Sequence, residues 1–115
     1  KSMGGRVATM LADELGAAGV VVFGYPFHPP KEPQKLRTAH LATLRAPTLI
    51  LQGERDPFST RDEVASYTLA PTITVTWLPD GDHSLAPRKK SGFTAAQHLD
   101  SAIAAAAAFV QRVTN

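Results

Sequence analysis

Two short, continuous apolar runs constrain the fold of this chain more than any other feature. Residues 19–23 read Gly-Val-Val-Val-Phe, and residues 47–51 read Pro-Thr-Leu-Ile-Leu. Neither run alternates polar with apolar side chains, so each predicts a strand buried on both faces, as in a parallel sheet covered by helices. Residues 72–78 alternate β-branched side chains and predict a third strand.

Helical patterns lie before and between these strands. Residues 2–15 repeat apolar side chains at helical spacing and predict a helix that stops at Gly16. The residues that give this helix one apolar face are Val7, Met10, Leu11 and Leu15. Thr60 and Glu63 have the spacing of a capping box, in which each side chain bonds the other residue's backbone N–H, and they predict a helix through Tyr67.

The remaining segments complete the pattern. Residues 25–33 hold four prolines and predict a loop, and a short helix is expected within residues 35–44. Residues 94–113 are rich in alanine and predict a long helix. The residues available for packing on it are Leu99, Ile103, Phe109 and Val113.

The resulting order is helix, strand, loop, strand, helix, strand, helix. Strands that alternate with helices predict a parallel sheet with right-handed crossovers, in a three-layer α/β/α arrangement. The chemically interesting residues follow strands or precede the first helix. They are therefore expected at the carboxyl edge of the sheet, where open α/β folds place their sites.

The first residues resemble a nucleophile elbow. Lys1-Ser2-Met3-Gly4 fits the x-S-x-G part of the G-x-S-x-G pattern, in which a serine occupies a strained turn that opens a helix. The backbone N–H of Met3 is the expected oxyanion donor. The alternative is that Ser2 only caps the helix.

Asp56 and His83 complete a possible catalytic triad. Asp56 follows the second predicted strand, and His83 follows the third. The order Ser2, Asp56, His83 is that of α/β-hydrolases, with His83 as base and Asp56 as the residue that orients it. Asp80 and Asp82 are rival carboxylates, but they share the loop of His83, whereas Asp56 reaches it from the neighbouring strand.

Four segments together resemble one α/β-hydrolase family, which includes bacterial dienelactone-hydrolase-like proteins and the hydrolase-like domain of a subunit of the NSL chromatin complex. The segments are Val-Phe-Gly-Tyr-Pro-Phe-His-Pro-Pro (22–30), Pro-Thr-Leu-Ile-Leu-Gln-Gly-Glu-Arg-Asp-Pro (47–57), Leu-Pro-Asp-Gly-Asp-His-Ser-Leu (78–85) and Pro-Arg-Lys-Lys-Ser-Gly (87–92). The resemblance implies the same triad of Ser2, Asp56 and His83. Dienelactone hydrolases proper use a cysteine nucleophile, and this chain has no cysteine.

The resemblance also implies that residues 1–115 are the C-terminal half of one α/β-hydrolase domain. Family members have further strands before the elbow, and these strands supply the second oxyanion donor. We therefore expect the sheet to need an N-terminal half or another chain for its completion, and these residues alone to expose an apolar sheet edge at residues 20–23 and one face of the first helix.

Two functions fit these patterns. The first is a serine hydrolase that acts on an ester or related acyl bond of a small molecule, and these 115 residues alone are expected to be inactive or incomplete. Tyr25 and the proline-rich loop would then wall the site, and His28 and Arg88 could contact substrate, although a solvated loop histidine and a solvated basic turn are the alternatives. The second is a non-catalytic interaction module on the same fold.

Composition narrows the remaining classes. The lack of cysteine excludes disulfides and thiolate metal sites, and the four histidines show no close ligand spacing, so neither metal nor cofactor is expected. Basic residues cluster only at residues 88–90, which disfavours nucleic-acid binding. The longest apolar stretch, residues 102–110, is too short for a membrane span. A cytoplasmic location fits these features.

Overall fold

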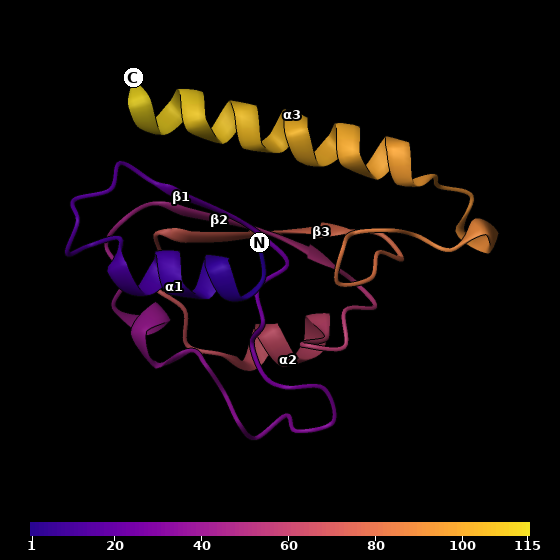
Figure 1. Cartoon of the computed structure of the whole chain (residues 1–115), viewed down its shortest axis with the longest axis horizontal. Coiled ribbons are helices and arrows are strands. Elements are labelled where there is room, and N and C mark those ends of the chain that lie inside the picture. Colours follow the sequence, from indigo (N-terminus) through magenta and orange to yellow (C-terminus); the bar gives the residue numbers. More distant parts are fainter.

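The three predicted strands form one parallel sheet in the order β1-β2-β3 (Figure 1). The computed structural model describes all 115 residues. The strands are β1 (Val20–Phe23), β2 (Thr48–Gly53) and β3 (Ile73–Leu78). In register, Val22 pairs with Ile50, which pairs in turn with Val75. The parallel α/β class predicted from the sequence is confirmed.

Helices cover both faces of the sheet, which gives the predicted three layers. Figure 1 shows α1 and α2 on one side of the strands and α3 on the other. The helices are α1 (Met3–Leu11), α2 (Arg61–Ser66) and α3 (Ala95–Thr114), with short 3-10 turns at η1 (Ala39–Ala42) and η2 (Lys89–Ser91). The predicted capping box of Thr60 and Glu63 is present at the start of α2.

Only the central strand is buried along its whole length. All six residues of β2 are buried, as predicted for residues 47–51. In β1 only Val22 is buried and the other three residues are half-buried, in keeping with the expectation that these residues alone expose an apolar sheet edge. The reason is its position, because β1 has a hydrogen-bonded neighbour on one side only.

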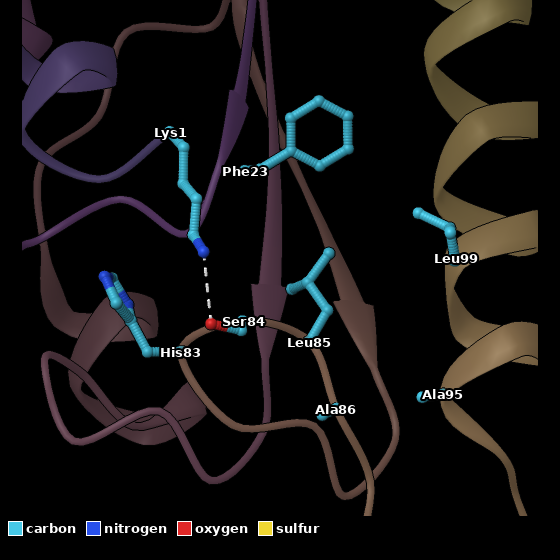
Figure 2. Close-up of a pocket in the computed structure, with 8 residues that line it drawn as sticks. All are labelled: Lys1, Phe23, His83, Ser84, Leu85, Ala86, Ala95 and Leu99. Carbon is cyan, nitrogen blue, oxygen red and sulfur yellow. Dashed lines mark hydrogen bonds between the residues drawn. The ribbon is translucent and has the colours of Figure 1, made fainter.

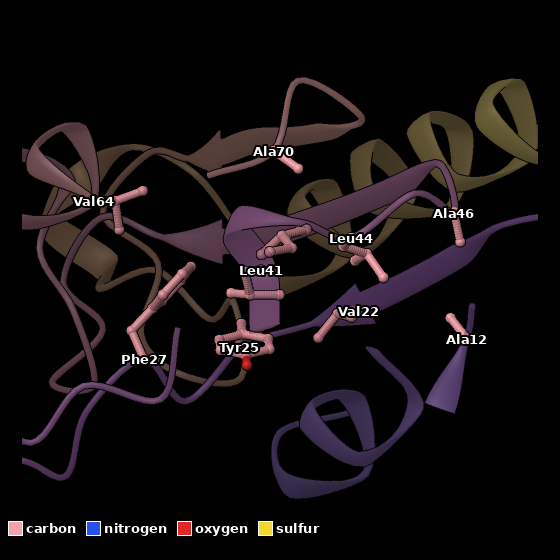
Figure 3. Packing of buried hydrophobic residues seen from close by; sticks show 10 residues of the cluster. Ala12, Val22, Tyr25, Phe27, Leu41, Leu44, Ala46, Val64 and Ala70 are labelled. Carbon is pink, nitrogen blue, oxygen red and sulfur yellow. The ribbon is translucent and has the colours of Figure 1, made fainter. Parts of the chain in front are cut away.

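Side chains of β2 pack into two separate hydrophobic clusters, one on each face of the sheet. Ile50 joins a cluster on the α1 and α2 face, with Val22, Tyr25 and Leu41 (Figure 3). Leu49 and Leu51 point the other way and pack with buried residues that include Ala102 and Phe109 of α3. This alternation fixes which helix lies on which face.

The face of α1 that packs on the sheet is not the apolar face that periodicity gives it. The residues buried against the sheet side are small: Gly5, Thr9 and Ala12. The predicted apolar face is exposed, with Leu15 at 74%. A Cβ on Gly5 would lie 2.3 Å from Cγ1 of Val22, so the helix approaches β1 on the face that lacks bulky side chains.

A similar difference holds for α3. Leu99 and Ile103 are exposed, whereas Phe109 is buried and Val113 partly buried. The short side chain of Ala102 and the ring of His98 complete the buried stripe. The buried stripe of α3 therefore runs through His98, Ala102 and Phe109, and only part of it coincides with the residues that periodicity selects.

Candidate active site

Three side chains from distant parts of the chain form one hydrogen-bonded line. Ser2 Oγ lies 2.8 Å from His83 Nε2, and His83 Nδ1 lies 2.8 Å from Asp56 Oδ2. A carboxylate can only accept, so Nδ1 carries the proton and the neutral ring keeps Nε2 free to accept from the serine hydroxyl. The structure thus brings together the three residues that the sequence singled out, in the predicted order.

Ser2 has the backbone of a strained turn. Its φ of 50° and ψ of −122° place this non-glycine residue at positive φ, which stores of order 1–3 kcal/mol. Its N–H donates to the carbonyl of Phe23 at the end of β1. Its side chain makes no capping hydrogen bond to α1. The helix-cap alternative is therefore wrong, and the hydroxyl is directed to His83 instead.

The N–H of Met3 has the position expected of an anion-binding donor. Met3 is the first residue of α1, where a backbone N–H has no partner within the helix. The backbone hydrogen bonds at this end of the helix use the N–H groups of Ser2, Gly4, Gly5 and Arg6, and not that of Met3. The positive end of the helix dipole lies at the same place.

Asp56 is enclosed and fully hydrogen-bonded. Only 1% of its surface is exposed. Its Oδ1 accepts from the N–H of Phe58 at 2.8 Å, and its Oδ2 accepts from Gln52 Nε2 at 3.0 Å as well as from His83. Burial raises the pKa of Asp56 above its ordinary value by more than the hydrogen bonds from His83 and Phe58 lower it.

The rival carboxylates are engaged elsewhere. Asp80 binds the guanidinium of Arg88 and also contacts Arg55; the hydrogen bonds from Arg88 hold the pKa of Asp80 far below its usual range. Asp82 Oδ1 accepts from the N–H groups of Ser84 and Ala86, which shapes the turn. Neither carboxylate hydrogen-bonds His83, in keeping with the predicted preference for Asp56.

Two residues that the sequence did not single out also support the line. Phe58 lays its ring against that of His83, with 4.3 Å between centroids and 34° between planes. Gln52 donates a hydrogen bond from its Nε2 to Asp56 Oδ2. A polar residue at the end of an otherwise apolar strand was the available signal for Gln52, because buried polar groups need partners. No comparable pattern marks Phe58.

The predicted substrate-binding residues have other roles in the structure. Tyr25 is fully buried in the core, where its hydroxyl donates to the carbonyl of Arg37, so it does not wall the site. His28 is buried, not solvated, between the Pro29 carbonyl and Glu63. Arg88 pairs its guanidinium with Asp80. These placements correct the expected contacts of Tyr25 and His28 with substrate, whereas that of Arg88, whose side chain is 46% exposed, stays a prediction.

The contacts of His28 predict a pH-dependent stability. Its Nδ1 lies 2.8 Å from the Pro29 carbonyl oxygen, and its Nε2 lies 3.1 Å from Glu63 Oε1, so both nitrogens face acceptors and the protonated ring satisfies both. Burial lowers the pKa of His28, but these hydrogen bonds outweigh it and the net pKa is raised. Burial likewise opposes the net lowering of the pKa of Glu63, which follows from hydrogen bonds with the N–H of Thr60 and with His28.

A raised histidine pKa stabilises the fold fully below the unfolded value of about 6.5 and ceases to do so as pH rises through the folded value. We therefore expect the contribution of His28 to the urea midpoint to fall as pH rises from about 6 to about 8.5, on either side of that unfolded value. Burial lowers the pKa of His40, whose contribution runs the opposite way, so the comparison with a Glu63 variant isolates that of His28. Glu63→Gln keeps a side-chain oxygen that accepts from the Thr60 N–H and removes the charge, so it should flatten this fall. If the urea midpoint falls equally with pH in the parent chain and in Glu63→Gln, the role assigned to His28 is contradicted.

A cavity of about 240 Å³ opens beside the histidine (Figure 2). Its apolar lining comes from Phe23, Leu85, Ala86, Ala95 and Leu99, and its polar lining from Lys1, His83 and Ser84. The ammonium of Lys1 donates to Ser84 Oγ at 3.2 Å across one side. The cavity therefore pairs an apolar space with the imidazole that contacts Ser2.

Other kinds of site are not evident among these residues. No three histidine, aspartate or glutamate side chains converge to hold a metal ion. No helix combines the length and the apolar character that crossing a bilayer requires.

Comparison with known families identifies the type of domain. Residues 1–111 match the family model described as an alpha/beta hydrolase domain, which covers nearly the entire chain. No solved structure matches the chain.

Proposed function

The chain belongs to the α/β-hydrolase family, and we propose from this that it is a serine hydrolase that cleaves an ester or a related acyl bond. The observation that carries the proposal is the continuous hydrogen-bonded line from Ser2 through His83 to Asp56. Such a line, with the histidine in the tautomer that accepts from serine, is what nucleophilic acyl transfer requires.

Each residue has a defined role in the proposed reaction. His83 Nε2 takes the hydroxyl proton of Ser2 as Oγ bonds to the acyl carbon, and the carbonyl electron pair moves onto the oxygen. The N–H of Met3 donates to this oxyanion. The oxyanion then collapses, the bond to the leaving group breaks, and His83 returns the proton to it. Water, deprotonated by His83, releases the acid from Ser2 by the same steps, and Asp56 stabilises the imidazolium in both halves.

The cavity supports an apolar acyl group of limited size. Phe23, Leu85 and Leu99 offer hydrocarbon surface next to His83. The volume of about 240 Å³ lies below the ~300–1,000 Å³ of pockets that enclose drug-sized ligands. A short acyl chain fits such a space better than a long one.

Within the family, we place the chain with the dienelactone-hydrolase-like proteins and the hydrolase-like domain of the NSL subunit. The motifs Gly-Glu-Arg-Asp-Pro at residues 53–57 and Gly-Asp-His at residues 81–83 support this grouping. It carries no substrate assignment, because Ser2 replaces the cysteine nucleophile of dienelactone hydrolases proper.

Covalent labelling tests the proposal. A fluorophosphonate probe should modify the folded chain once, and mass spectrometry of the digested protein should locate the adduct on Ser2. The urea-unfolded chain, in which the contact with His83 is lost, should not react. A folded protein that includes the N-terminal strands of the domain and neither reacts nor hydrolyses p-nitrophenyl acetate or butyrate would favour the non-catalytic interaction module instead.

A further inference from the structure

A buried glutamine lies directly behind the carboxylate of the site. Gln52 occupies β2, the central strand, and has no exposed surface. Its Nε2 lies 3.0 Å from Asp56 Oδ2, 3.0 Å from Ser59 Oγ and 3.1 Å from the carbonyl oxygen of Tyr25. Its Oε1 accepts from the N–H of Tyr25 at 2.8 Å. One amide thus links the loop after β1 to the loop after β2.

The orientation of this amide is fixed by its partners. The N–H of Tyr25 can only donate, so it requires the oxygen of Gln52. The NH₂ group must then face Asp56 and the Tyr25 carbonyl, both of which accept. The opposite orientation would set two oxygens against each other at Asp56 and two donors against each other at Tyr25.

We propose that Gln52 is a positioning residue of the hydrolase site, which holds the Asp56 carboxylate in register with His83 through the oxygen that both side chains share. The effect of Gln52 on the reaction rests on the proposed function. Asp56 Oδ2 accepts from both His83 Nδ1 and Gln52 Nε2, so the amide limits where that oxygen can move. A misplaced oxygen would release the imidazole from the orientation that reaches Ser2.

Gln52 also favours the ionised form of Asp56, and it does so without carrying a charge itself. A donor to a carboxylate favours its ionised form, and Asp56 is in a buried place where ionisation is otherwise disfavoured. The other titratable groups that face Asp56 are His83, Asp82 and His28. None of these supplies a permanently neutral donor. The donors of that kind are the Gln52 amide and the Phe58 N–H, and of the two only the amide shares Oδ2 with His83.

Gln52→Glu separates positioning from packing. The variant keeps the shape and the oxygen for the Tyr25 N–H, and it replaces the NH₂ with a second carboxyl oxygen. While the introduced carboxyl group holds a proton it can still donate to Asp56; once it ionises, two carboxylates face each other. We expect the rate of fluorophosphonate labelling at Ser2 to be near that of the parent at low pH and to fall about tenfold or more below it as pH rises, because repulsion between the two carboxylates displaces the oxygen that orients His83.

Gln34→Glu and Ser59→Ala are the matched controls. Gln34→Glu adds the same charge at an exposed position of the proline-rich loop. Ser59→Ala removes a member of the same buried cluster that does not contact His83, and leaves the bond between Gln52 and Asp56 in place. Both should keep the pH profile of the parent, although Ser59→Ala lowers the melting temperature.

A second readout is independent of catalysis and of the Glu variant. The Nδ1–H proton resonance of His83, followed by NMR, should shift or broaden in Gln52→Met and remain unchanged in Gln34→Glu. A pH-independent ratio of labelling rates for Gln52→Glu, or an unchanged His83 resonance in Gln52→Met, would overturn the proposal. A parent chain that is never labelled but shows the predicted His83 changes would instead overturn the hydrolase function and retain the positioning role.

Discussion

Ser2→Ala is expected to fold like the parent chain and to lose hydrolysis of p-nitrophenyl butyrate by about 10⁴- to 10⁶-fold in kcat, the scale seen when a triad member is removed. The loss follows because no other hydroxyl contacts His83 Nε2. Folding should be preserved because the Ser2 side chain caps no helix and its only side-chain hydrogen bond is the one to His83.

The neutral control for this experiment is Ser101→Ala. Ser101 is an exposed residue of α3 and makes no side-chain hydrogen bond. Its replacement should leave both activity and melting temperature as they are. Ser2→Ala with turnover near that of the parent, at equal purity and equal folded fraction, would remove Ser2 from the mechanism.

The second large effect is expected from Gly53→Ala, at the end of β2. A Cβ at this position would lie 2.2 Å from the carbonyl oxygen of Asp82 and 2.3 Å from that of Gly81. Both are backbone atoms, so no side chain can turn aside, and the loop that carries His83 must move. We expect a loss of about 3 kcal/mol or more in the free energy of unfolding, at the upper end of overpacking costs.

For a chain of this size, such a loss corresponds to a fall of roughly 10 °C or more in Tm, measurable by circular dichroism. The activity of Gly53→Ala should fall by a larger factor than its fraction of folded protein, because displacement of the loop separates His83 from Ser2. Gly4→Ala is the comparison, since nothing lies within 4 Å of a Cβ there and alanine favours the helix. Equal melting curves for Gly53→Ala and the parent would show that the loop yields without strain.

The class of fold and the three site residues were predictable because they depend on local signals. The apolar run of β2 needs no knowledge of its neighbours, and the capping box at Thr60 is complete within four residues. Asp56 and His83 each follow a strand, and parallel strands bring their carboxyl ends to one edge. Proximity of the site residues therefore followed from the order of elements alone.

The faces of the helices were not predictable in the same way. Periodicity selects large apolar residues, such as Val7 in α1 and Leu99 in α3, yet both are exposed. The contact faces are set by how closely each helix approaches the sheet, as Gly5 shows by its lack of room for a Cβ beside Val22. The distance between a helix and the sheet depends on both elements, so it cannot be predicted from the sequence of either one.

Roles in the loops depended on tertiary partners as well. Tyr25 and His28 lie in a proline-rich segment that predicts an exposed loop. In the structure both are buried, with hydrogen bonds to Gln52 and Glu63 of other elements. Arg88 stands in a basic run whose charge is matched by Asp80, eight residues earlier. Each pairing joins residues whose partnership neither local sequence encodes.

The line from Ser2 to His83 spans 81 residues of chain, and that from His83 to Asp56 spans 27. Both contacts require β1, β2 and β3 to have paired in parallel, and this pairing closes long loops before stabilising contacts form, which slows folding. Helices can form early without creating any part of this line. The proposed capacity to hydrolyse an ester should thus arise at the end of folding, and recovered turnover after dilution from urea would time the completion of the sheet.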